Sequence, residues 1–139
     1  MNRMFLLTGV LALGVIVSSN VVKAEDDKEV PSIKEIMKTA HGEAGSKAKI
    51  TKAIAGEAWD DAQAAAKDWV KQAEALAKNK PTKGKDASWK KLTTSYTKNV
   101  KALAAAADKK DADGAKAALK TLGTSCGGCH GPHKPKKGE

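Results

Sequence analysis

The chain has very few bulky aromatic residues: its 139 residues include three Trp, one Tyr and one Phe. The single Phe is Phe5, so the sequence beyond residue 24 has none, while alanine is abundant there. An alanine side chain buries little area, and burial stabilises a fold by roughly 25 cal/mol per Å² of apolar surface. Such a domain is short of residues that fill a core, and a large planar apolar cofactor would supply the missing volume.

Arginine is scarce as well. Arg3 is the only arginine, and lysine supplies nearly all the positive charge behind a net charge of +9. A basic chain indicates a nucleic-acid partner when its cations cluster on one face. Here the lysines are spread along every segment. This distribution argues against nucleic acid and favours attraction to acidic partner proteins.

Long apolar runs are missing apart from Phe5–Val17, near the start of the chain. A positive charge in Met1–Arg3 precedes the run, and "VVKA" follows it with small residues at the −3 and −1 positions of a cleavage site after Ala24. This pattern predicts a secretory signal peptide over residues 1–24. A membrane anchor is the alternative, but a spanning helix needs about 20 apolar residues. We therefore expect export to the periplasm, no stable membrane anchor, and one domain over residues 25–139.

Beyond the signal peptide, apolar residues recur every three or four positions, which is typical of one-sided helices. The pattern predicts four helices and no strand, with the helices over residues 32–55, 57–78, 87–107 and 111–130. Breaker residues fill the connection Asn79–Lys85. Four helices with short connections predict an all-α fold, an antiparallel up-down four-helix bundle, whose facing side chains can house a cofactor.

The first predicted helix carries further signals at its start and in its middle. Ser32 and Glu35 form a capping box at the start of the first helix. Gly42 and Gly45 weaken the middle of that helix, but we expect it to continue to about Ala55. Its expected inward residues are Ile33, Ile36, Met37, Ala40, Ala44 and Ala48.

The last helix is expected to end at His130. Gly131 precedes Pro132, and the residue before a proline avoids the helical conformation. His133 follows in a polar tail, so we expect it on the surface.

Cysteine is limited to two residues, and both lie in "TSCGGCHGPHK", residues 124–134, together with two of the three histidines. A structural zinc site needs four ligands, and there is no second cysteine pair. A thioredoxin-like dithiol accompanies a βαβ pattern, which this chain lacks. A disulfide closing so short a loop would stabilise little, because the gain rises with loop length.

The spacing C-x-x-C-H, residues 126–130, is the signature of c-type haem attachment. Two thiols three residues apart on a helix reach the two vinyl groups of one haem edge, and the adjacent imidazole ligates the iron. Cys126 and Cys129 also continue the inward face of Leu119 and Leu122 along the helix. The sequence therefore predicts one covalently bound haem c, with His130 as the proximal ligand.

A four-helix bundle with C-x-x-C-H near its end, preceded by "LAAAADKKDADGAKAALKTLGTSC", resembles the cytochrome c′ family, the class II c-type cytochromes. The resemblance covers residues 25–139 in organisation and is most specific over Cys126–His130. It implies that the first helix crosses the distal face of the haem, where family members carry either an apolar residue or a methionine. The matching position is Met37, which favours the methionine-ligated low-spin branch. His41, four residues on, is the rival distal ligand, and an open site is the third alternative.

The expected function follows from this ligand set. His–Met ligation predicts a periplasmic electron carrier that docks on the acidic surface of a redox partner protein. An open distal site would instead give a five-coordinate haem that binds nitric oxide or carbon monoxide. We expect no enzymatic turnover, because positioned proton-transfer groups other than His41 are lacking. The resemblance also allows a homodimer.

Overall fold

The computed structural model describes residues 30–135, so the signal peptide predicted for residues 1–24 lies outside the described residues. Five helices follow one another, and the described residues form no strand. The helices are α1 (Ile33–His41), α2 (Ser46–Ala55), α3 (Trp59–Lys78), α4 (Asp86–Asp108) and α5 (Ala112–His133).

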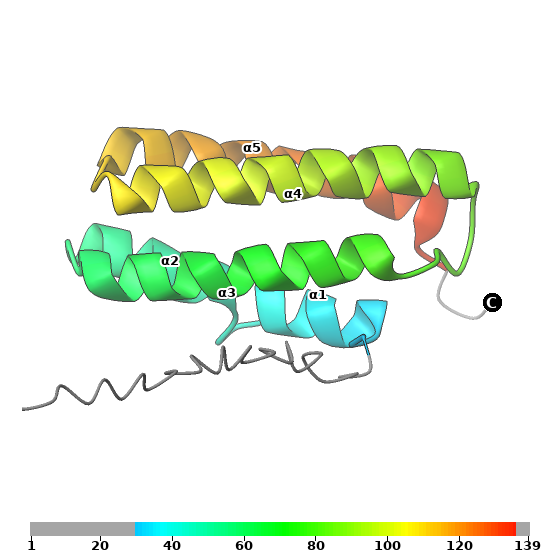
Figure 1. Ribbon diagram of the computed structural model, residues 1–139, viewed down its shortest axis with the longest axis horizontal. Helices are drawn as coiled ribbons and strands as arrows, with labels where there is room; N and C mark the ends of the chain where they lie inside the picture. Colours follow the sequence, from blue (N-terminus) through cyan, green and yellow to red (C-terminus); the bar gives the residue numbers. More distant parts are fainter. Residues whose placement is uncertain (1–29, 136–139) are drawn as a thin grey trace, which may run out of the picture.

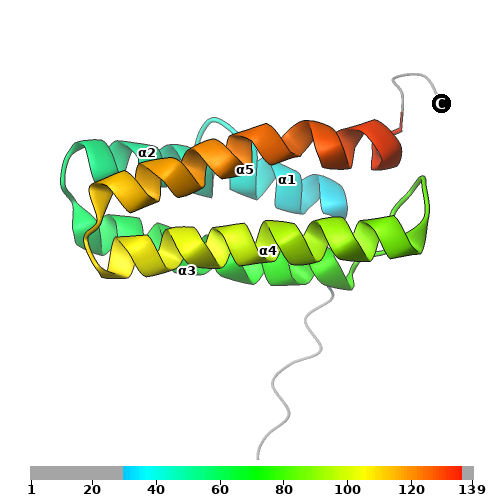
Figure 2. The same ribbon diagram turned by 90° about the horizontal axis from the view of Figure 1, so that it is seen from above.

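The helices form a four-helix bundle in which α1 and α2 together make the first arm (Figures 1 and 2). Packing joins helices that are neighbours in sequence: α2 packs on α3, α3 on α4, and α4 on α5. In Figure 1, α4 and α5 form one layer, and α1, α2 and α3 form the other. The predicted all-α class and four-helix bundle are confirmed, and the packing is consistent with up-down connectivity. Within residues 30–135, no helix has the length and apolarity needed to cross a bilayer.

The first arm is broken, and the prediction of one continuous helix to Ala55 is wrong. The backbone turns to an extended conformation at Gly42 and again at Gly45. A Cβ added at Gly42 would lie 2.5 Å from the Lys38 carbonyl oxygen, and one at Gly45 would lie 2.7 Å from that of Thr39. The chain can fold back this closely only where a side chain is absent.

The break changes which residues of the first arm face inward. Ala44, expected inside, is exposed, and Ala48 is half-buried. Ile50 and Ile54 of α2 are buried instead. The helical period restarts at Ser46, so the inward face of α2 is out of phase with that of α1.

The core has two parts. The larger surrounds Trp69, whose side chain is fully buried, and consists mainly of alanines, Ile50, Val100, Leu103 and Leu122. The smaller consists of Ile36, Leu76 and Trp89; we call it the α1–α3–α4 cluster. The helical period of residues 57–78 predicts an inward face of Trp59, Ala62, Ala66, Trp69, Ala73 and Leu76. Trp59 is half-buried, and the other five are buried.

The last helix extends beyond the predicted end at His130. α5 continues through Pro132 to His133, and His133 is buried with 4% of its surface exposed. The prediction that His133 lies on the surface is therefore wrong. Its ring nitrogens hydrogen-bond to residues of the α3–α4 connection and of α4, and these tertiary contacts override the local effect of the proline.

Candidate functional site

Cys126 and Cys129 lie one turn apart on α5, and both are free thiols with half-buried side chains. The Cys126 thiol donates to the Leu122 carbonyl oxygen at 3.5 Å. Cys129 packs against the α1–α3–α4 cluster. Burial, and then the charge of Cys126, raise the pKa of the Cys129 thiol. Both thiols are thus held at the edge of the core, accessible but not fully solvated.

Tyr96 connects three helices near these thiols. Its hydroxyl accepts a hydrogen bond from Trp69 Nε1 at 2.6 Å and lies 2.9 Å from His41 Nε2. An indole N–H is only a donor, so the hydroxyl proton is left to donate to His41 Nε2. The rings of His41 and Trp69 also meet edge to face, with centroids 5.4 Å apart.

The ionisation of Tyr96 and His41 favours this hydrogen-bond direction. Burial raises the pKa of Tyr96 to about 12, the Trp69 bond lowers it, and the charges of Cys126 and Cys129 raise it further. Burial, followed by the positive charges of Lys47 and His130, lowers the pKa of His41. A protonated phenol beside a neutral imidazole is the pairing in which Tyr96 donates and His41 accepts.

Tyr96 is the only tyrosine of the chain, and no part in the site was predicted for it. A hydroxyl on an inward face needs a polar partner once it is buried. The sequence therefore carried one signal, that a buried Tyr96 hydroxyl needs a hydrogen-bond partner such as Trp69 or His41.

The predicted axial ligands come from α1 and α5. Met37 is half-buried and packs against the α1–α3–α4 cluster, as Cys129 and Tyr96 do. His130 is exposed on α5, yet its charge is among those that lower the pKa of His41. Met37 and Cys129 thus pack against the same cluster, and the charge of His130 acts on His41.

The helices that carry these residues are not in direct backbone contact. No Cα atom of α1 lies within 8 Å of one in α5, whereas α2 does approach α5 that closely. Close backbone approach between the first arm and α5 is therefore confined to α2.

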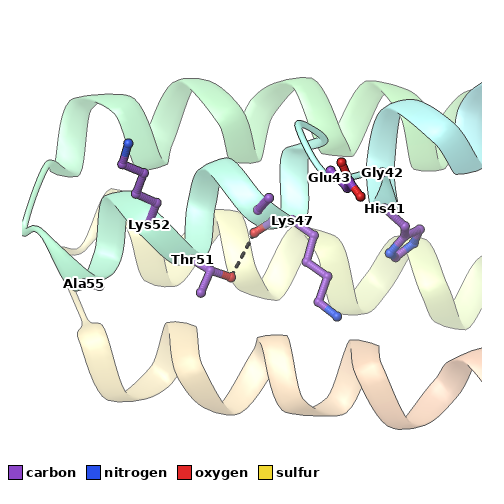
Figure 3. Close-up of a pocket in the computed structure, with 8 residues that line it drawn as sticks. His41, Gly42, Glu43, Lys47, Thr51, Lys52 and Ala55 are labelled. Carbon is purple, nitrogen blue, oxygen red and sulfur yellow. Dashed lines mark hydrogen bonds between the residues drawn. The ribbon is translucent and has the colours of Figure 1, made fainter.

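A shallow hollow of about 530 Å³ opens beside His41, along α2 (Figure 3). His41 and Lys47 extend from the first arm in the same direction, and Thr51 Oγ1 donates to the Lys47 carbonyl oxygen at 2.9 Å. The full lining is His41, Gly42, Glu43, Lys47, Ala48, Thr51, Lys52 and Ala55. Neither thiol nor His130 lines it, so it is separate from the thiol edge of α5.

Among residues 30–135, no three or more His, Cys, Asp or Glu side chains are grouped to hold a bare metal ion. Two free thiols one turn apart, an adjacent imidazole and a thioether on α1 are instead the ligand types of a c-type haem. The residues present fit that group.

The comparisons with known proteins give no independent assignment: no protein-family profile, curated protein or solved structure matches the chain.

Proposed function

We propose that this chain is an exported c-type cytochrome of the cytochrome c′ family that carries single electrons in the periplasm. One haem c would be held by thioethers to Cys126 and Cys129, with His130 as the proximal ligand of its iron. The observation that carries the proposal is the C-x-x-C-H segment on the last helix of a four-helix bundle, with both thiols free and half-buried. When bound, haem supplies a one-electron couple whose potential depends on its axial ligands.

The hydrogen bonds favour Met37 over His41 as the distal ligand. His41 Nε2 is engaged by the Tyr96 hydroxyl, and ligation through Nε2 would leave the Tyr96 proton without its acceptor in a buried site. Losing a buried partner costs about 1–3 kcal/mol. Among residues 30–135, no side-chain hydrogen bond reaches the Met37 thioether, so the sulfur has no competing partner to release.

The surface suits docking to an acidic partner protein. Lysines lie on every helix, and many of their side chains are exposed. Two ion pairs among the described residues, Lys71–Asp68 and Lys101–Glu74, join side chains that are themselves exposed. The exposed lysines can steer an acidic redox partner, and no catalytic turnover is proposed.

A second function is favoured by one observation, the position of the Tyr96 hydroxyl. Hydrogen-bond donors in a distal pocket help decide whether haem binds a gas, and Tyr96 lies near both thiols. If Met37 stays off the iron, the protein is a five-coordinate haem protein that binds nitric oxide or carbon monoxide.

Absorption spectra test the proposal on full-length protein produced with a haem-attachment system in the periplasm. We expect covalently bound haem with a low-spin ferric spectrum and the sulfur-to-iron charge-transfer band of His–Met ligation. The Met37→Ala variant should lose that band and become high-spin. A wild-type spectrum that is high-spin and shifts on addition of carbon monoxide would favour gas binding. Low-spin iron that persists in Met37→Ala but not in His41→Ala would identify His41 as the ligand.

A further inference from the structure

The end of α5 is held by a set of contacts that the proposed electron-transfer role does not explain. The buried His133 ring uses both of its nitrogens: Nδ1 lies 2.8 Å from the Lys83 carbonyl oxygen, and Nε2 lies 2.7 Å from Ser88 Oγ. Its edge meets the Trp89 ring with centroids 5.3 Å apart. We call these contacts, made by His133 with Lys83, Ser88 and Trp89, the C-terminal clasp.

The direction of these hydrogen bonds follows from the partners. A carbonyl oxygen only accepts, so Nδ1 carries a proton and donates to Lys83. Nε2 meets the Ser88 hydroxyl, which also lies 3.1 Å from the Lys85 carbonyl oxygen; in the neutral ring, Nε2 and this carbonyl oxygen are the two acceptors for the hydroxyl proton. His133 therefore bridges the α3–α4 connection and the first turn of α4, which Figure 1 shows beside the end of α5.

The α3–α4 connection is shaped around this ring. Gly84 has φ +86°, and a Cβ at that position would lie 2.6 Å from His133 Nδ1 and 2.8 Å from the Pro132 carbonyl oxygen. Only glycine can bring the backbone this close in the left-handed region. The connection and the end of α5 are therefore complementary in shape as well as in hydrogen bonding.

The segment from Cys126 to His133 has few other contacts to hold it, apart from the packing of Cys129 and a 3.5 Å hydrogen bond from Thr82 Oγ1 to the His133 carbonyl oxygen. Gly127, Gly128 and Gly131 have no neighbour within 4 Å of their Cβ positions, and glycine and proline are the poorest helix formers. Pro132 cannot donate the hydrogen bond that a helix requires at its position. His130 lies in the middle of this weak segment.

We infer that His133 is a positioning residue for the haem site: the C-terminal clasp fixes the last turn of α5 and thereby holds the His130 imidazole where it ligates iron. This inference rests on the proposed function, because His130 has a ligand to orient only if haem is attached. A purely structural role is the alternative, in which the clasp stabilises the bundle and leaves the iron unaffected.

The test compares the holoprotein with two clasp variants and a matched control. Ser88→Ala removes the partner of Nε2, together with the Ser88 bond to the Lys85 carbonyl oxygen, and His133→Leu removes both hydrogen bonds of the ring. Ser46→Ala is the control, because its hydroxyl also bonds across helices, to Gln72 of α3, away from α5. Hydrogen exchange of the residue 129–134 amides, the ferric spectrum and the midpoint potential are measured for each protein.

We expect His133→Leu to speed exchange of these amides at least about tenfold, since two buried hydrogen bonds are lost. Its spectrum and potential should shift, Ser88→Ala should shift them less, and Ser46→Ala should leave them unchanged. His133→Asn keeps a donor at the position of Nδ1 and should recover part of the wild-type potential. It also serves as the second variant if His133→Leu does not fold.

The outcomes separate the two proposals. Wild-type protein without covalent haem overturns the proposed function and this inference together. Wild-type protein with haem, and clasp variants whose spectrum and potential equal those of Ser46→Ala, overturn the inference and leave the proposed function standing.

Discussion

The Tyr96→Phe substitution removes one oxygen atom from the centre of the Trp69–Tyr96–His41 network and leaves the ring in place. Trp69 is fully buried, and its Nε1–H would lose the acceptor that it meets at 2.6 Å. An unsatisfied buried donor costs about 1–3 kcal/mol, and the lost bond to His41 adds about 0.5–1.5 kcal/mol. We expect a loss of about 2–3 kcal/mol in the free energy of unfolding.

Urea unfolding of the full-length chain without haem, followed by circular dichroism, measures this loss. For a domain of this size each kcal/mol lowers Tm by about 4–8 °C, so thermal unfolding gives a second estimate. Thr97→Val is a matched control on the same helix, because Thr97 donates to a backbone carbonyl, that of Ala73, at 3.2 Å, and its loss leaves no buried donor behind. A loss below about 0.5 kcal/mol in Tyr96→Phe, within the range of ordinary surface substitutions, would refute the view that this network stabilises the bundle.

Three further predictions concern other parts of the structure. The pKa of His41 is lowered from 6.5 in the folded chain, so near that pH the unfolded chain binds more protons than the folded chain. The free energy of unfolding should therefore fall as the pH drops below about 6.5. His41→Gln should flatten the urea midpoint as a function of pH in this range. Gly84→Ala should destabilise the fold by about 1–3 kcal/mol, because Gly84 has a positive φ and its Cβ would meet the His133 ring. Gly123→Ala has open space at its Cβ and should stabilise the fold by about 0.4–1 kcal/mol. Tm values of both variants equal to that of the wild type would contradict both predictions. The raised pKa of Cys129 should slow its alkylation at neutral pH in the folded, haem-free protein relative to the same thiol in urea. Mass spectrometry of the digested chain measures both rates, and equal rates would contradict the prediction.

The helical period was sufficient to predict the bundle. Trp69, Ala73 and Leu76 recur at helical spacing, and all are buried as expected. Their positions follow from local periodicity and from the need to bury one face, which the sequence carries directly.

The two errors arose where contacts distant in sequence decide the local structure. A glycine in a helix costs only about 1 kcal/mol, so nothing local required a break at Gly42 and Gly45. The break becomes necessary where the chain folds back onto Lys38 and Thr39. At the other end, the clasp formed by His133 extends α5 past Pro132, and its partners are some fifty residues away.

The sequence indicates candidate residues for the site but not the hydrogen bonds that connect them. Spacing alone indicated Cys126, Cys129 and His130, because two thiols and an imidazole at that separation have one well-known use. The pairing of Tyr96 with His41 joins residues 55 positions apart, and no local pattern predicts it. That pairing is what favours Met37 as the distal ligand.

The central claim is that Cys126 and Cys129 hold haem covalently, and the mass of the denatured protein tests it most directly. The full-length chain is produced with a haem-attachment system, extracted with acid and acetone, and weighed by mass spectrometry beside the Cys126→Ser/Cys129→Ser variant. We predict that the wild-type chain retains the mass and colour of one haem through denaturation, and that the double variant retains neither. A wild-type chain that leaves denaturation colourless, with the mass of the polypeptide alone, would contradict the account.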